Sequence, residues 1–155
     1  MKKLLITQST VLFGGSVFAW YNVTRNFVRF YQVEGTIFKV HNCLIPNPVT
    51  EACFYGAIAF LIAFMWSLYI LNSEKHWRQQ RYLWWLLGAG TLFAWFNVTK
   101  EFVNFYSLRT GPALGCSAIP ITNPFFTPCF TGASIFLLAT ILAGFISSRI
   151  NAKKD

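Results

Sequence analysis

Four cysteines have the most specific chemistry in this 155-residue chain. They are Cys43, Cys53, Cys116 and Cys129, so nine residues separate the first two and twelve separate the last two. Thiol-disulfide enzymes often carry a C-x-x-C pair, because a short loop between the cysteines tunes thiol reactivity. The chain contains no such pair, and its spacings therefore favour structural disulfides over redox catalysis.

Patterns for metal, haem or phosphate binding are missing from the sequence. His41 lies near Cys43, but the chain has only two histidines and lacks the closely spaced ligand pairs of zinc sites. No histidine falls within a long apolar stretch, which argues against haem. Glycine-rich phosphate loops and serine–histidine arrangements are missing too. We therefore expect no catalytic residue, no metal and no cofactor.

Two similar segments place polar side chains at the ends of long apolar stretches. Residues three or four apart share one face of a helix, and such a polar face within a membrane usually lines the bundle interior or a water-filled cavity. The alternative is that the basic residues anchor the helices at the membrane surface. The polar faces carry Asn22, Arg25 and Arg29 in the first segment, and Asn97, Lys100, Glu101 and Asn104 in the second.

The composition predicts a membrane protein. Hydrophobic residues make up 55% of the chain and charged residues only 12%, whereas soluble domains carry about 25% charged residues. The net charge of +8 does not indicate nucleic-acid binding, because the basic residues lie at the ends of apolar runs rather than on one soluble face. Membrane lipid is therefore the expected surrounding.

Four apolar runs are long enough to cross a bilayer, which takes about 20 residues of helix. Separate runs of this length indicate helices rather than a barrel, so we predict an all-α protein with four transmembrane helices. Thr50 and Thr127 are candidate N-caps of the second and fourth helices. The predicted spans are residues 4–31, 52–71, 83–106 and 129–146.

Basic residues predict the orientation. Eight lie at the termini and in the connection 73–82, against two, Lys39 and Arg109, in the loops 32–51 and 107–128. Because positive charge stays in the cytoplasm, we expect both termini and the 73–82 linker to be cytoplasmic, in a cell (inner) membrane. A cleaved signal peptide is the alternative for the N-terminal run, but its Phe-Ala-Trp sequence recurs within the third span.

The chain repeats itself. Residues 18–31 align with 93–106 at an offset of 75, with ten of fourteen positions identical, and Asn-Pro, Cys-Phe and Gly-Ala pairs recur at an offset of 76. The repeats run from about 4 to 72 and from about 83 to 148, within one membrane domain. Each contains two spans, so we expect two parallel helical hairpins related by a pseudo-twofold axis along the membrane normal.

Each repeat carries one cysteine pair on the expected outer, oxidising side of the membrane. This distribution predicts the disulfides Cys43–Cys53 and Cys116–Cys129, although four cysteines allow three connectivities.

Four spans with two outward cysteine pairs resemble quinone-linked disulfide oxidoreductases, of the bacterial disulfide-bond-formation and vitamin K epoxide reductase kind. The resemblance covers topology and cysteine number, while the C-x-x-C pair of those enzymes is missing. It implies thiol–disulfide exchange at the outward cysteine pairs with a quinone as the electron acceptor.

The residues themselves favour a different, non-enzymatic function. We predict a ligand- or lipid-binding, transport-like or accessory subunit with a polar vestibule that opens outward between the hairpins. Its basic lining would suit an anionic ligand, a lipid headgroup or an acidic partner segment, and a homo-oligomer or a larger membrane complex is expected. Glu101, which replaces Asn26 of the first repeat, is expected to pair with Arg25 or Arg29 across the hairpins.

Overall fold

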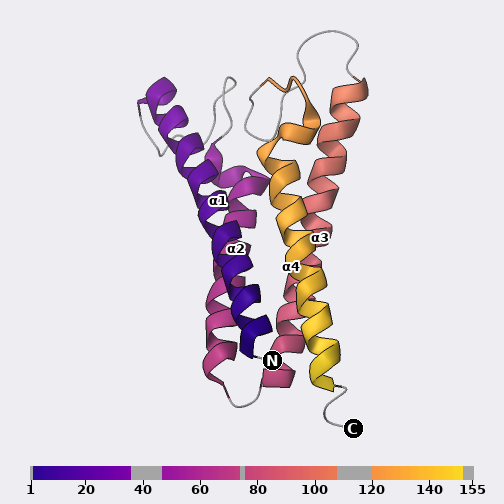
Figure 1. The fold of residues 1–155 in the computed structure, drawn as a ribbon. Coiled ribbons are helices and arrows are strands. Elements are labelled where there is room, and N and C mark those ends of the chain that lie inside the picture. Colours follow the sequence, from indigo (N-terminus) through magenta and orange to yellow (C-terminus); the bar gives the residue numbers. More distant parts are fainter. Residues whose placement is uncertain (1, 36–46, 74–75, 108–119, 152–155) are drawn as a thin grey trace.

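The computed structural model describes residues 2–35, 47–73, 76–107 and 120–151, and this part of the chain is almost wholly helical (Figure 1). The all-α prediction is confirmed. Two short 3-10 helices, η1 (Pro48–Thr50) and η2 (Pro124–Phe126), precede the second and fourth α-helices. The α-helices are α1 (Lys2–Glu34), α2 (Ala52–Asn72), α3 (His76–Ser107) and α4 (Pro128–Asn151).

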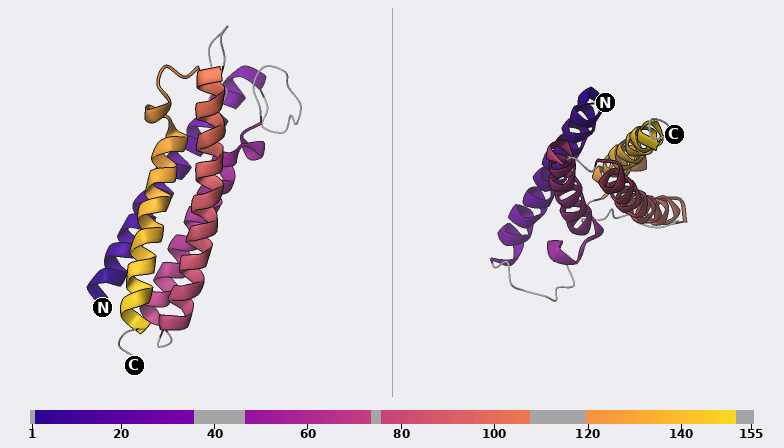
Figure 2. Two further views of the ribbon diagram at one scale, coloured as in Figure 1. Left: turned by 90° about the vertical axis from the view of Figure 1, so that its right-hand side faces the viewer. Right: turned by 90° about the horizontal axis from the view of Figure 1, so that it is seen from below.

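The helices associate as two antiparallel pairs. α1 packs mainly on α2 and α3 mainly on α4, while smaller contacts of α2 with α3 and of α1 with α4 join the pairs. The start of α1 and the end of α4 lie at the same end of the bundle, which we call the terminal end. At the opposite, loop end the pairs diverge, and α1 is inclined to the other helices (Figures 1 and 2).

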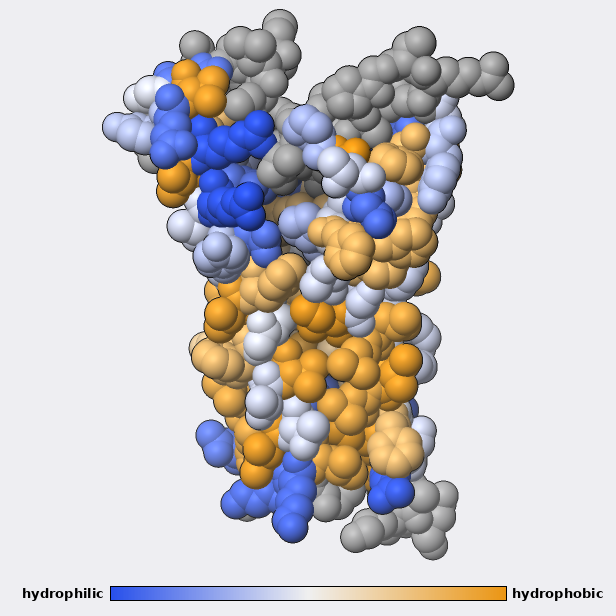
Figure 3. Space-filling model, turned by 45° about the horizontal axis from the view of Figure 1, so that its top comes forward, coloured by the Kyte–Doolittle hydropathy of each residue, from blue (hydrophilic) through white to orange (hydrophobic). Residues whose placement is uncertain are grey.

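Three of the four helices are long and apolar enough to cross a membrane: α1, α2 and Pro128–Ile150 of α4. α3 is 32 residues long, but it is richer in tryptophan and has charged ends. On the face shown in Figure 3, hydrophobic residues form a band around the middle and hydrophilic residues gather at both ends. A membrane protein is therefore indicated.

The helices extend beyond the predicted spans at several ends, and α4 continues to Asn151 rather than ending at 146. α3 begins at His76, so most of the expected linker 73–82 is helical. α1 continues to Glu34 and ends where Gly35 adopts a φ of 66° and donates its backbone N–H to the Tyr31 carbonyl at 2.9 Å. Glycine favours this left-handed conformation because it has no Cβ.

The N-cap expected at Thr50 was wrong. Thr50 lies inside η1, where its hydroxyl donates to the Asn47 carbonyl at 2.7 Å, and Glu51 is the residue that precedes α2. The equivalent expectation for Thr127 was correct, because its hydroxyl oxygen accepts the Phe130 backbone N–H at 3.3 Å. The predicted N-cap of α2 therefore lies one residue before the observed one.

The core between the two pairs is built around two phenylalanines and two glycines. The rings of Phe60 on α2 and Phe136 on α4 stack with centroids 3.8 Å apart, and both are buried. An added Cβ at Gly15 would lie 2.5 Å from the Phe60 ring, and one at Gly90 would lie 2.9 Å from the Phe136 ring. Each ring therefore occupies space that a side chain on α1 or α3 would otherwise fill.

A polar contact crosses the bundle nearer the terminal end. Gln80 Nε2 donates to Gln8 Oε1 at 2.9 Å and to the Ala143 carbonyl at 3.4 Å, and both glutamine side chains are fully buried. A buried amide that loses its hydrogen-bond partner lowers the stability of the fold. This contact therefore favours one arrangement of α1, α3 and α4 relative to one another.

The packing at the glycines makes a first prediction. Gly15→Ala and Gly90→Ala should each destabilise the detergent-solubilised protein by about 1–3 kcal/mol, the usual cost of overpacking a core, because an added Cβ would lie so close to a buried phenylalanine ring that the ring must shift. Thermal unfolding measures the effect. Gly14→Ala and Gly88→Ala are matched controls, since an added Cβ meets nothing within 4 Å there. Equal melting temperatures for all four variants would contradict the packing described.

Candidate functional site

A polar cavity of about 170 Å³ lies between the hairpins at the loop end. Arg25 and Asn26 of α1 and Glu101 of α3 contribute charged and amide groups to its wall. The segment 120–129, which leads into α4, closes another side, with Thr122, Asn123 and Thr127 among its polar residues. This cavity lies where the sequence predicts a polar vestibule.

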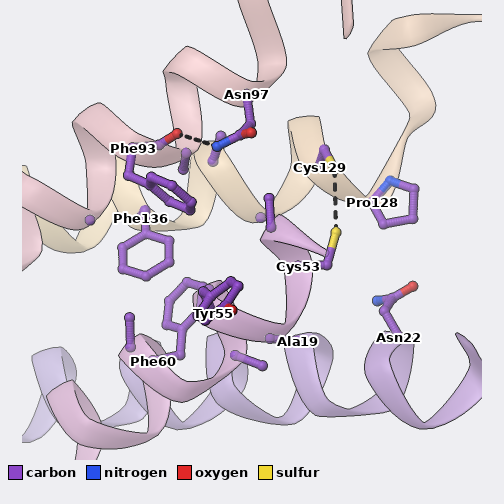
Figure 4. Close-up of a pocket in the computed structure, with 18 of the residues that line it drawn as sticks. Ala19, Asn22, Cys53, Tyr55, Phe60, Phe93, Asn97, Pro128, Cys129 and Phe136 are labelled. Atoms are coloured by element: carbon purple, nitrogen blue, oxygen red, sulfur yellow. Dashed lines mark hydrogen bonds between the residues drawn. The ribbon is translucent and has the colours of Figure 1, made fainter. Parts of the chain in front are cut away.

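An apolar cavity of about 90 Å³ adjoins it on the side toward the middle of the bundle. Small residues make room for it: Gly56 and Ala57 on α2 and Gly132 and Ala133 on α4 line it. Phe60 and Phe136 also line it (Figure 4), so the ring stack of the core forms one of its walls. This cavity was not predicted from the sequence.

Cys53 and Cys129 lie at the junction of the two cavities. Their sulfur atoms are 3.4 Å apart, in a hydrogen-bond contact in which either sulfur can donate (Figure 4). Both cysteines line both cavities, as do Asn22 and Pro128. A covalent S–S bond is about 2.05 Å long, so the contact is not a disulfide. One cysteine belongs to each repeat, at equivalent positions 76 residues apart.

The two buried acids at the loop end each bind a neutral partner within their own hairpin. Asn26 Nδ2 of α1 donates to Glu51 Oε2 at 3.2 Å. In the second hairpin, the Thr127 hydroxyl donates to Glu101 Oε2 at 3.3 Å. Glu51 is 7% exposed and Glu101 is 5% exposed. In the sequence alignment of the two halves, Glu101 matches Asn26 and Thr127 matches Glu51. The acid therefore directly precedes the second helix in the first hairpin and lies on the first helix in the second hairpin.

The structure brings together only part of the predicted polar faces. Glu101 and Arg25 line the same cavity, and Glu101 accepts a hydrogen bond from the Thr127 hydroxyl. Asn22 and Asn97 line the apolar cavity, and each donates its amide to a carbonyl four residues earlier, in Phe18 and Phe93, at 2.8 Å.

Three other predicted residues lie away from both cavities. Lys100 is exposed, with its Nζ 5.3 Å from the centroid of the Phe96 ring. Asn104 is exposed and Arg29 half-buried. Lys100 therefore fits the interfacial-anchor interpretation better than the cavity interpretation. Cys43 and Cys116 lie outside the described residues, as do the two disulfides predicted to contain them.

The chemistry of this site is hydrogen bonding, charge and sulfur contact. Within the four described ranges, no group of three His, Cys, Asp or Glu side chains is placed to hold a metal ion. The apolar cavity and the sulfur contact, which were not predicted, had a signal in the sequence. Gly56, Ala57 and Cys53 recur 76 residues later, and equivalent positions of a repeat often meet.

No protein-family model, curated protein or solved structure matches the chain.

The buried Thr127 makes the second prediction. Thr127→Val removes the hydroxyl that donates to Glu101 and caps the start of α4, so the unfolding free energy should fall by about 1–3 kcal/mol. Thr99→Val is the matched control, because the Thr99 side chain is exposed and its hydroxyl donates only to the Trp95 carbonyl. Thermal melts in one detergent compare the two, and similar melting temperatures would mean that the Glu101 contact contributes nothing.

Proposed function

We propose that the chain is a four-span membrane protein made of two parallel hairpin repeats. The length of α3 and the strong pairing of α1 with α2 and α3 with α4 support this arrangement. So do matching contacts in the two hairpins: Trp20 meets Phe54 edge-on at 6.3 Å, and Trp95 meets Phe130 edge-on at 6.0 Å between ring centroids. The pseudo-twofold axis then passes between Phe60 and Phe136, with the terminal end in the cytoplasm.

Cysteine labelling tests the orientation. In a cysteine-free background, Phe126→Cys should react with a membrane-impermeant maleimide added to intact cells, because Phe126 is 86% exposed at the loop end. Arg78→Cys, exposed at the terminal end, should react only after the cells are permeabilised. The reverse pattern would invert the topology, and labelling of both from outside would remove the transmembrane arrangement.

We infer that the two cavities together bind an amphiphile with an anionic headgroup. The observation that carries this is their junction: a polar cavity with Arg25 on its wall opens directly onto an apolar cavity lined by aromatic and small residues. A headgroup in the first would place the attached apolar part in the second. We infer an anionic headgroup because the Arg25 guanidinium binds phosphate and carboxylate groups well, whereas the Glu101 carboxylate of the same wall accepts a hydrogen bond from Thr127.

Size limits how much of the ligand the site encloses. Pockets that bury a whole small molecule usually measure about 300–1,000 Å³, and the apolar cavity measures about 90 Å³. It therefore holds one end of a chain or a ring, and the remainder of the molecule lies between the helices or in surrounding lipid. This makes a binding or accessory role a better fit than full enclosure of a soluble substrate.

Filling the apolar cavity tests the proposal. Gly56→Leu and Gly132→Leu should each lower the amount of co-purifying anionic amphiphile several-fold, because a side chain at either position projects into the cavity without a close contact. Gly14→Leu is the control, since Gly14 is exposed on α1 and lines neither cavity. Native mass spectrometry with lipid analysis measures occupancy.

The headgroup contact has its own pair of variants. Arg25→Gln should lower the same occupancy, whereas Lys100→Gln, which removes an exposed charge outside the cavities, should leave it unchanged. If neither the filled cavity nor the loss of Arg25 changes occupancy, the amphiphile is not bound at this site.

A second candidate function is supported by the sulfur contact. Cys53 and Cys129 line the apolar cavity, where the ring of a quinone could approach them, as the resemblance to quinone-linked thiol oxidoreductases implies. The pre-reduced protein, mixed with a short-chain ubiquinone, would then convert it to the quinol with loss of two thiols per turnover. Failure to reduce the quinone leaves the amphiphile-binding proposal as the function.

A further inference from the structure

Cys53 and Cys129 are the side chains through which the two hairpins meet at the junction of the cavities. Cys53 is the second residue of α2 and Cys129 the second residue of α4. Their sulfurs touch at 3.4 Å, and both side chains are half-buried. At the same end, the buried carboxylates of Glu51 and Glu101 accept hydrogen bonds from Asn26 and Thr127 of their own hairpins.

We propose that Cys53 and Cys129 form a reversible disulfide that joins the two hairpins and closes the passage between the polar and apolar cavities. This assigns regulation to the site described above, and the gating part rests on the proposed amphiphile binding. The pairing differs from the one expected from the sequence, because it links the two repeats rather than the ends of one loop.

The geometry allows the bond to form with a small movement. A disulfide places its sulfurs about 2.05 Å apart, so the two sulfurs must approach by about 1.4 Å from 3.4 Å. The packed rings of Phe60 and Phe136 lie seven residues further along their helices, which is about two turns. The helix starts can therefore move together while the core stays in place.

There is also room for this movement. Gly56 and Gly132 lie three residues after the cysteines, and an added Cβ at either would meet nothing within 4 Å. No bulky side chain at these positions stands between the helices just below the sulfurs. Closing the gap would shrink the apolar cavity, since both glycines and both cysteines line it.

The polar cavity supplies the route for the oxidant, because both cysteines line it. Starting from two thiols, one thiolate attacks a small-molecule disulfide such as oxidised glutathione, forming a mixed disulfide and releasing one glutathione thiolate. The second cysteine thiolate then attacks the cysteine sulfur of the mixed disulfide, forming the Cys53–Cys129 bond and releasing the second glutathione. The two cysteine protons pass to the two glutathione thiolates, so one disulfide is consumed and one is made.

A chain cut between the hairpins reads out this bond directly. A protease site inserted after Ser73 divides the full-length protein into fragments that each contain one hairpin and its cysteine pair. The reduced protein in mild detergent is treated with oxidised glutathione, cleaved and run on a non-reducing gel. Disulfides within each repeat leave two separate fragments, whereas a bond between Cys53 and Cys129 holds them together.

We expect most of the oxidised protein to migrate as joined fragments that separate on reduction. The double variant Cys43→Ser/Cys116→Ser should still join, and adding Cys53→Ser or Cys129→Ser should abolish the joined band. Peptide mapping of the oxidised wild-type protein should identify the Cys53–Cys129 peptide pair, which keeps the test valid if the double variant does not fold. Separate fragments and no such peptide in the oxidised wild type would overturn the proposal.

Gating has a separate readout. A fluorescent fatty-acid analogue should bind the oxidised double variant several-fold more slowly than the reduced one, and reduction should restore the rate. If the bond forms and the rate is the same in both states, the disulfide exists but does not control the cavity. If the analogue binds neither state while the bond still forms, the amphiphile-binding proposal fails and the inter-hairpin disulfide stands.

Discussion

The stacked rings of Phe60 and Phe136 are the contact on which the arrangement of the hairpins depends. Apolar association gains little in lipid from the hydrophobic effect, so close packing must hold helices together there. Each ring fits against a glycine of its own hairpin, Gly15 or Gly90, and the two rings meet between the hairpins. The same rings bound the apolar cavity, and the small residues Gly56, Ala57, Gly132 and Ala133 line it further toward the loop end. The packing of the two rings therefore determines both the core between the hairpins and one wall of the cavity.

Different kinds of contact form within and between the hairpins at the loop end. Within hairpins, buried carboxylates accept hydrogen bonds from Asn26 and Thr127, and interactions of this kind are costly to break when they are buried. Between hairpins, the contact seen at the cavity junction is that of two sulfurs. Further along the bundle, the stacked rings and the Gln8–Gln80 hydrogen bond also join the two hairpins.

The sequence predicted the helices well and the site only in part. Long apolar runs define helices without reference to anything else, so Leu4, Ala52, Leu83 and Cys129 all begin expected spans that fall within helices. The polar cavity followed from Asn22, Arg25 and Glu101, which share a polar character within apolar surroundings. Lys100 was assigned to the same face but turns outward over Phe96, because neighbouring positions on a helix diverge by a third of a turn.

The apolar cavity and the sulfur contact could not be read from periodicity. Both depend on how closely α2 approaches α4, and that distance is set by the volumes of Gly15, Gly90 and the rings between them. The presence of one cysteine pair in each half of the sequence predicted Cys43 as the partner of Cys53. The distance between Cys53 and Cys129 arises instead from a contact between helices 76 residues apart.

If the two halves of the chain arose by duplication, the exchanged acid constrains the order of the substitutions that separate them. One hairpin pairs Asn26 with Glu51, and the other pairs Glu101 with Thr127, so two substitutions separate them. If the acid was gained first, the intermediate had two carboxylates facing each other in a buried place, where like charges are strongly unfavourable. If it was lost first, the intermediate had an amide facing a hydroxyl, which can still form a hydrogen bond. The accessible mutational path therefore passes through the neutral pair. In either hairpin, a second carboxylate introduced before the existing one is lost would face a like charge in a buried place.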